Sequence, residues 1–151
     1  MTGDRAFIDE NDRERRRLAD LVTRLSDDDL SRPMEAGWTV ASVLLHMAFW
    51  DYRIVTMLDR WRPDGWNETP TYDERAVHWI NDTTKAIFLD VPPRVAAAIA
   101  VTAAEMTDSA VADLSDEVLA RNEALGNVLN PYRSEHRGEH LDELEAMFPG
   151  G

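Results

Sequence analysis

The sequence predicts an all-α fold: a single domain over residues 1–151, built as a four-helix bundle with crossover connections. Four long segments carry apolar residues at three- and four-residue steps, which is the spacing of helices that bury one face. No segment shows the alternation of apolar and polar residues that is typical of a half-buried strand. The long connections at 26–38 and 62–92 favour a crossover over a simple up-down-up-down order.

The composition is that of a globular domain and excludes several kinds of partner. Hydrophobic residues make up 44% and charged residues 30% of the chain, as is usual for soluble proteins. A net charge of −13 argues against binding to nucleic acid or to an anionic membrane surface. The absence of cysteine excludes disulfides, thiolate metal sites and a cysteine nucleophile. Residues 1–20 lack the apolar core of a secretory signal, and no apolar run approaches the length of a membrane span, so we expect a cytoplasmic protein.

The first helix is predicted within residues 10–30 and should end near residue 25. A polar break runs from Ser26 to Pro33, after an apolar stripe made of Leu18, Leu21, Val22 and Leu25. The charged residues at 13–17 are of mixed sign, which indicates a solvated helix face. A phosphate clamp is the alternative interpretation of this run.

The second helix is predicted from about residue 40 to residue 61. Thr39 is suited to cap its N-terminus, and Trp38 and Val43 have the spacing of a hydrophobic staple. The apolar stripe of this helix comprises Val43, Met47, Trp50, Ile54, Met57 and Trp61. His46 falls on the same stripe, so its imidazole is either a hydrogen-bonded core group or a ligand that points into the protein.

Residues 62–72 have the composition of a loop, and residues 73–88 predict a third, shorter helix. Trp66 in the loop is expected to cover one end of the core, with an aromatic wall of a ligand pocket as the alternative. His78, on the third helix, lies one step off the apolar stripe. We therefore expect it to be a partly exposed structural residue.

The C-terminal half predicts three more helices. Asp90 or Val91 should cap a helix that begins at two prolines and runs to about residue 107. A short helix at 116–123 should be capped by Ser115. The last helix should begin at Asn130-Pro131, since proline is well tolerated at the first helical position.

His136 and His140 carry the chemistry of the last helix. They lie four residues apart, so they project from one face with Cβ atoms about 6 Å apart, and both can bind one metal ion at about 2.0–2.1 Å. With His46 they would leave one position of a tetrahedral shell open, as in catalytic metal sites. The alternative is two partly exposed histidines and a buried His46 bonded to a carbonyl. Gly138, between the pair, costs about 1 kcal/mol relative to alanine and indicates a close helix approach.

The sequence resembles the DinB/YfiT-like four-helix bundles, a superfamily that includes maleylpyruvate isomerase N-terminal-like domains and low-molecular-weight thiol S-transferases. The matching residues are Gly37-Trp38-Thr39-Val40 at a helix start, His46 and Trp50 along that helix, and His136-Arg137-Gly138-Glu139-His140 near the C-terminus. The resemblance implies that His46, His136 and His140 bind a divalent metal, commonly zinc or nickel, with water completing the shell.

The resemblance also implies an enzyme that acts on a small-molecule substrate by thiol transfer, isomerisation or hydrolysis. Because the chain has no cysteine, any thiol must be a low-molecular-weight cosubstrate from outside. Asp51 and Glu139 are candidate catalytic carboxylates, and Trp50 and Trp66 are candidate cofactor-binding aromatics. A homodimer is considered as the assembly. The alternative functions are a metal-dependent hydrolase and a non-catalytic bundle that sequesters a metal or small molecule.

The segment from His136 to His140 also matches the H-x-x-E-H motif of inverted zinc peptidases, in which the glutamate activates water. That match is confined to five residues in a chain far shorter than those enzymes, so a peptidase is the weaker interpretation. In either case the imidazoles must be neutral to bind metal. With a reference pKa of about 6.5, metal affinity is expected to fall below about pH 6.

Overall fold

The computed structural model describes residues 4–64 and 72–150, and within these ranges the regular elements are helices. The α-helices are α1 (Ala6–Arg24), α2 (Asp27–Leu30), α3 (Val40–Asp64), α4 (Glu74–Phe88), α5 (Pro93–Ala112), α6 (Asp116–Ala124) and α7 (Arg133–Met147). A short 3-10 helix, η1 (Glu35–Gly37), precedes α3. The predicted all-α fold is confirmed.

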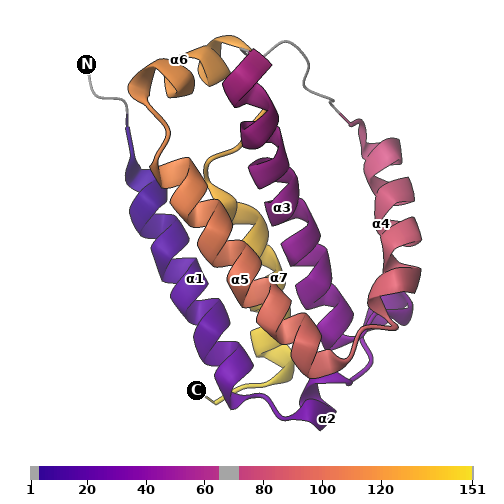
Figure 1. Cartoon of the computed structure of the whole chain (residues 1–151). Helices are drawn as coiled ribbons and strands as arrows, with labels where there is room; N and C mark the ends of the chain where they lie inside the picture. Colours follow the sequence, from indigo (N-terminus) through magenta and orange to yellow (C-terminus); the bar gives the residue numbers. More distant parts are fainter. Residues whose placement is uncertain (1–3, 65–71, 151) are drawn as a thin grey trace.

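Four of these helices, α1, α3, α5 and α7, form the bundle (Figure 1). Helix α5 packs against α3 and α1, and α7 packs against α1 and α3. Helices α1 and α7 run toward the end that holds α2 and the C-terminus, whereas α3 and α5 run away from it (Figure 1). Because α3 and α5 are parallel neighbours, the chain needs a crossover between them, and α4 provides it along the outside of α3.

Helix α3 begins where the sequence predicts, because Thr39 and Ser42 cap it reciprocally. The Ser42 amide donates to Thr39 Oγ1 at 3.1 Å, and the Thr39 amide donates to Ser42 Oγ at 2.8 Å. Most of the predicted stripe is buried, with Trp50 partly exposed; the buried members are Val43, Met47, Ile54, Met57 and Trp61. The helix ends at Asp64, three residues later than predicted.

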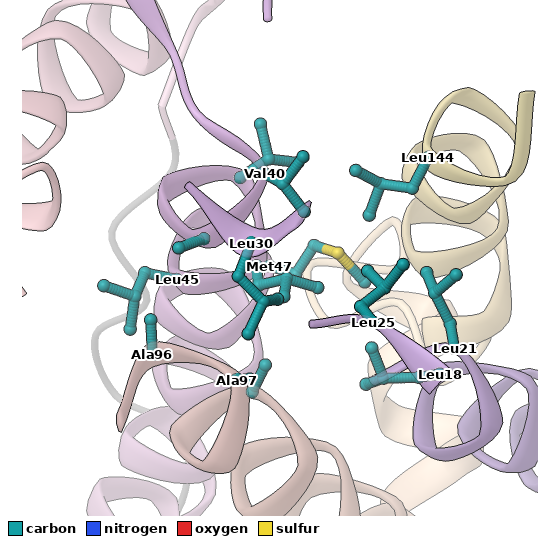
Figure 2. Packing of buried hydrophobic residues seen from close by; sticks show 14 of the residues in the cluster. Leu18, Leu21, Leu25, Leu30, Val40, Leu45, Met47, Ala96, Ala97 and Leu144 are labelled. Carbon is teal, nitrogen blue, oxygen red and sulfur yellow. The ribbon is translucent and has the colours of Figure 1, made fainter. Parts of the chain in front are cut away.

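Helix α5 is longer and more central than the sequence predicts. It runs five residues beyond residue 107, and its N-cap is Pro92 rather than Asp90 or Val91. Its buried face is rich in alanine, which lets α3 approach closely; Figure 2 shows Ala96 and Ala97 in this packing. Contrary to the sequence expectation, α5 is long and apolar enough to cross a membrane by length and composition. Its buried alanines instead belong to the bundle core.

The other boundaries differ from the predictions only locally. Helix α1 ends at Arg24, and Ser115 caps α6 by accepting from the Val118 amide at 3.2 Å, as predicted. Helix α7 begins at Arg133 rather than at Asn130, because the Asn130 side chain accepts from the Tyr132 amide in a turn before the helix. The charged run at 13–17 is more than a solvated face, since Arg15 and Arg17 pair with acids on other bundle helices.

The interior is divided along the bundle axis into two apolar clusters. One contains Leu18 of α1, Val40 of α3 and Leu144 of α7, and Figure 2 shows its packing. The other contains Phe7 of α1 and Ile54 of α3. On every bundle helix, buried polar side chains lie between the residues of the two clusters; they are Asn11, Asp51, Thr107, Asp108, Arg133, Ser134 and Arg137. A polar layer therefore crosses the core.

Candidate metal centre

The three predicted ligands converge in the structure. His46 on α3 and His136 on α7 have their Nε2 atoms 3.2 Å apart, and the Nε2 atoms of His140 and His136 are also 3.2 Å apart. The three rings meet edge to face, with centroid separations of 4.7 to 5.2 Å. Neighbouring ligands of a tetrahedral ion with bonds of about 2.0–2.1 Å lie about 3.3 Å apart. The nitrogens thus have the spacing that a metal ion requires.

Burial keeps these imidazoles neutral. The His46 side chain is buried, which lowers its pKa to about 4; His140 lowers it further, and Asn81 opposes the shift. Burial, followed by the neighbouring histidines and arginines, lowers the pKa of His136 to about 3. Burial also lowers the pKa of His140, although Glu143 and Glu139 act in the opposite direction. The reference pKa of about 6.5, on which the sequence-based expectation for metal affinity rests, is therefore higher than the pKa of each imidazole in the folded site.

The arrangement of the three histidines suits binding of a metal ion better than hydrogen bonding among the rings. Each neutral imidazole carries one N–H and one lone pair, so three Nε2 atoms that face each other cannot all be hydrogen-bonded. The Nδ1 atoms of His46 and His140 are buried and have no hydrogen-bond partner among the described residues. A cation would bind the three Nε2 lone pairs and leave Nδ1 as the N–H of each ring. The donor set therefore fits a divalent metal.

A pocket of about 840 Å³ opens beside His46 and His140. Its other walls come from the loop before α3, from α3 itself, and from α4 and α7; they are Pro33, Met34, Glu35, Ala36, Trp38, Val43, Asn81, Glu143 and Met147. The Trp38 indole meets the His46 ring edge to face, with centroids 5.7 Å apart. The loop is closed by the Met34 amide, which donates to the Trp38 carbonyl at 2.7 Å. Trp38 is thus the aromatic wall of this pocket.

The two predicted cofactor-binding tryptophans have different outcomes. Trp50 is not among the pocket walls; its indole Nε1 donates to Asn81 Oδ1 at 2.9 Å and ties α4 to α3. Asn81 itself lines the pocket, so Trp50 contacts the site through this amide. Trp66 lies outside the described residues.

The two predicted catalytic carboxylates lie away from the pocket walls. Asp51 is 4% exposed, and its carboxylate accepts hydrogen bonds from Arg133 at 3.1 Å and Arg137 at 3.3 Å. Burial raises the pKa of Asp51, and the two arginines oppose this shift. Glu139 is exposed on α7. Glu143, which sequence reasoning missed, lines the pocket with Oε2 3.9 Å from His140 Nδ1.

A buried ion cluster lies next to the histidines, and sequence reasoning missed it as well. It comprises Arg15 of α1, Asp51 of α3, Asp108 of α5, and Arg133 and Arg137 of α7. Arg137 is 2% exposed and donates to both oxygens of Asp108, at 2.9 and 3.0 Å. The only sequence signal was the pair of arginines flanking His136, three residues before it and one after it. The cluster joins all four bundle helices.

Two further sequence expectations concern residues outside the three-histidine group. The His78 side chain is 70% exposed and lies 3.6 Å from Glu74 on the same helix, so His78 is a surface residue. At Gly138, an added Cβ would lie 3.7 Å from Glu14 Oε2, which is an ordinary contact. Helix α1 does pass close to Gly138, but the spacing does not demand a glycine there.

Comparison with known proteins gives one match. A family model described as the DinB superfamily matches residues 10–141, a range that includes His46, His136 and His140. No curated protein and no solved structure matches the chain.

Proposed function

The chain belongs to the DinB superfamily, and on this premise we propose that it is a metal-dependent enzyme that transfers a small thiol to an electrophilic substrate. One observation carries the proposal: three imidazoles, held neutral by burial, have their Nε2 atoms at metal-ligand spacing beside a pocket of about 840 Å³. Because the chain contains no cysteine, the thiol is a cosubstrate. The function suits the cytoplasm, where small thiols are kept reduced.

In such a reaction the residues of the site would have two roles, metal binding and proton transfer. A divalent cation, zinc or nickel, would supply a Lewis acid that lowers the pKa of a thiol. His46, His136 and His140 would hold it beside the pocket that His46 and His140 line. Glu143 is the pocket carboxylate nearest the histidines and is placed to take the thiol proton.

The apolar walls hold the second substrate. Trp38, Val43 and Met147 offer an apolar surface that excludes water from the electrophile. The sulfur then forms a bond to the electrophilic carbon, and the leaving group departs with its electron pair. If the electrophile is a conjugated double bond, addition of the thiol and its later loss would isomerise that bond.

The test is a conjugation assay with protein loaded with zinc or nickel, a panel of small thiols and an activated aryl chloride as electrophile. We expect conjugation that requires the metal, stops on addition of a chelator and is lost in His136→Ala. His78→Ala is the matched control and should keep full activity, since His78 is exposed on α4. If the loaded protein neither binds nor consumes any thiol, the proposal is wrong. Ester hydrolysis would then separate a hydrolase from a sequestering protein.

A further inference from the structure

We infer that the pocket selects thiols that also carry a cationic group, such as aminothiols, over thiols that carry a carboxylate. This inference rests on the proposed function and concerns its substrate class. It starts from the charges of the pocket walls. Among the described residues that line the pocket, the charged side chains besides histidine are two carboxylates, Glu35 and Glu143, with no lysine or arginine.

The two carboxylates come from different elements and share the pocket with the metal ligands. Glu35 lies in η1, and Glu143 lies on α7 one turn beyond His140. His46, which lines the same pocket, is more than nine-tenths buried and has an Nδ1 atom without a hydrogen-bond partner among the described residues. A ligand whose sulfur reaches the histidines therefore places the rest of its chain in an acidic environment.

Two cations lie near the pocket, and both are held by its backbone. The Lys85 ammonium donates to the Ala36 carbonyl at 3.0 Å and lies 5.5 Å from the centre of the Trp38 ring. The Arg32 guanidinium donates to the Met147 carbonyl at 3.4 Å. Neither side chain is among the pocket walls, so neither is placed to bind a ligand carboxylate inside the pocket.

Charge complementarity follows from this arrangement. The three histidines with a divalent cation suit the thiolate end of a ligand, whereas Glu35 and Glu143 suit an ammonium group at the other end. The lysine over Trp38 shows that this indole face attracts a cation as well. A ligand carboxylate in the same place would face two like charges and no lysine or arginine among the pocket walls.

The test uses cobalt-loaded protein and three thiols of matched chain length: cysteamine, 2-mercaptoethanol and 3-mercaptopropionate. Binding is followed by the absorption band that a thiolate gives with cobalt, so the readout does not depend on turnover. The affinity ratio of cysteamine to 3-mercaptopropionate is compared between the unmodified protein and a Glu35→Gln/Glu143→Gln variant. Differences in thiol acidity cancel in this comparison.

We expect the ratio to fall about tenfold in the double variant, which is the scale of a few exposed charge pairs. Glu35→Gln alone, which leaves the neighbour of His140 intact, should give part of the fall. The matched control, Glu117→Gln/Glu123→Gln on α6, removes the same charge at the other end of the bundle and should leave the ratio within about twofold. High salt should bring the ratio of the cysteamine affinity to the 3-mercaptopropionate affinity closer to one in the unmodified protein.

The outcomes separate the two proposals. If all three thiols bind and the ratio does not change in the double variant, or changes equally in the α6 control, the charge selection is wrong and the thiol function stands. If none of the three thiols gives a cobalt band, the proposed function is wrong and the charge selection falls with it.

Discussion

The three-histidine site and the buried ion cluster lie next to each other in the bundle, and they satisfy their polar groups in opposite ways. In the ion cluster each buried charge faces an opposite charge, as Arg137 faces Asp108 and Asp51. In the histidine site the groups are neutral, their Nε2 atoms face one another, and two Nδ1 atoms have no partner among the described residues. The charges of the ion cluster are paired within the folded chain, although Arg137 Nε has no hydrogen-bond partner among the described residues, whereas the three Nε2 atoms of the histidine site could be paired by a metal ion.

The comparison shows how a bundle can hold an unsatisfied site in its interior. Asp51 lies on α3 five residues after His46, and its partners Arg133 and Arg137 flank His136 on α7. The ion pairs between these helices fix the register of α3 against α7, which brings His46 to the histidines of α7. The ion pairs thus hold α3 and α7 in place, which the unpaired histidine nitrogens cannot do.

The largest effect should come from breaking the ion cluster. Arg137→Met in metal-free protein should lower the free energy of unfolding by about 3–5 kcal/mol, because Asp108 and Asp51 would remain buried without this partner. Urea unfolding measures the change. Arg16→Met, at a side chain 76% exposed, is the control and should change stability by less than about 0.5 kcal/mol. A loss of less than about 1 kcal/mol for Arg137→Met would contradict the role given to the cluster.

Acid should weaken the fold through the histidine site. The folded pKa of His46 is lowered to about 4, so between about pH 6.5 and pH 4 the unfolded chain binds more protons than the folded chain. The stability of metal-free protein should therefore fall as the pH falls through this window, by about 3 kcal/mol from His46 alone. Urea midpoints at about pH 7 and pH 4.5 would show it. His46→Gln should make the dependence shallower, with His136 and His140 accounting for what remains, and His78→Gln should leave it unchanged; equal profiles in all three proteins would refute the assignment.

A metal should stabilise the histidine site without affecting the ion cluster. Zinc at about 100 times its dissociation constant should raise the free energy of unfolding by about 2.7 kcal/mol. Metal analysis should find one zinc per chain, retained in His78→Ala and lost in His46→Ala and in His140→Ala. Because burial lowers the pKa of His46 to about 4, the folded protein should keep its metal well below pH 6. Full metal content in His46→Ala would show that another residue is the third ligand.

The side-chain amide of Asn81, on α4, should raise the zinc affinity of the metal site. Its Oδ1 accepts from Trp50 Nε1, and the same residue lies beside the His46 imidazole, where it raises the pKa of His46. Asn81→Ala should weaken zinc binding about tenfold, which is the scale expected when a polar group beside a metal ligand is removed. Trp50→Phe should have a smaller effect in the same direction. A competition titration with a chelating dye gives both values, and unchanged affinity in Asn81→Ala would exclude this role.

The smallest change tests whether α7 needs its glycine between the two ligands. Gly138→Ala should stabilise the protein by about 0.5–1 kcal/mol, because alanine has the higher helix propensity and its Cβ meets Glu14 Oε2 at an ordinary 3.7 Å. Zinc affinity should not change. A destabilised variant would mean that α1 cannot accommodate even a methyl group at this position.

Periodic patterns made most of the fold and the ligand set predictable. His46 on a buried stripe and His136 and His140 at helical spacing identified three residues that the structure brings together. Local patterns did not predict the role of a side chain whose hydrogen-bond partners lie far away in the sequence. Asp51 reads as a polar residue near a ligand, and only the packing of α7 against α3 shows that its oxygens are already bonded to arginines.

The sequence by itself determined the helices, their capping at Thr39 and Ser115, and the inward direction of the histidines, because these depend on contacts within a few residues. Only the tertiary structure decided which walls form the pocket and which charges are paired. Trp38 and Glu143 become pocket residues because the loop before α3 folds against α7. Arg137 reaches Asp108 because α7 and α5 face each other across the core. Such contacts join residues far apart in the chain. Their geometry is set by how whole helices pack, which no local pattern encodes.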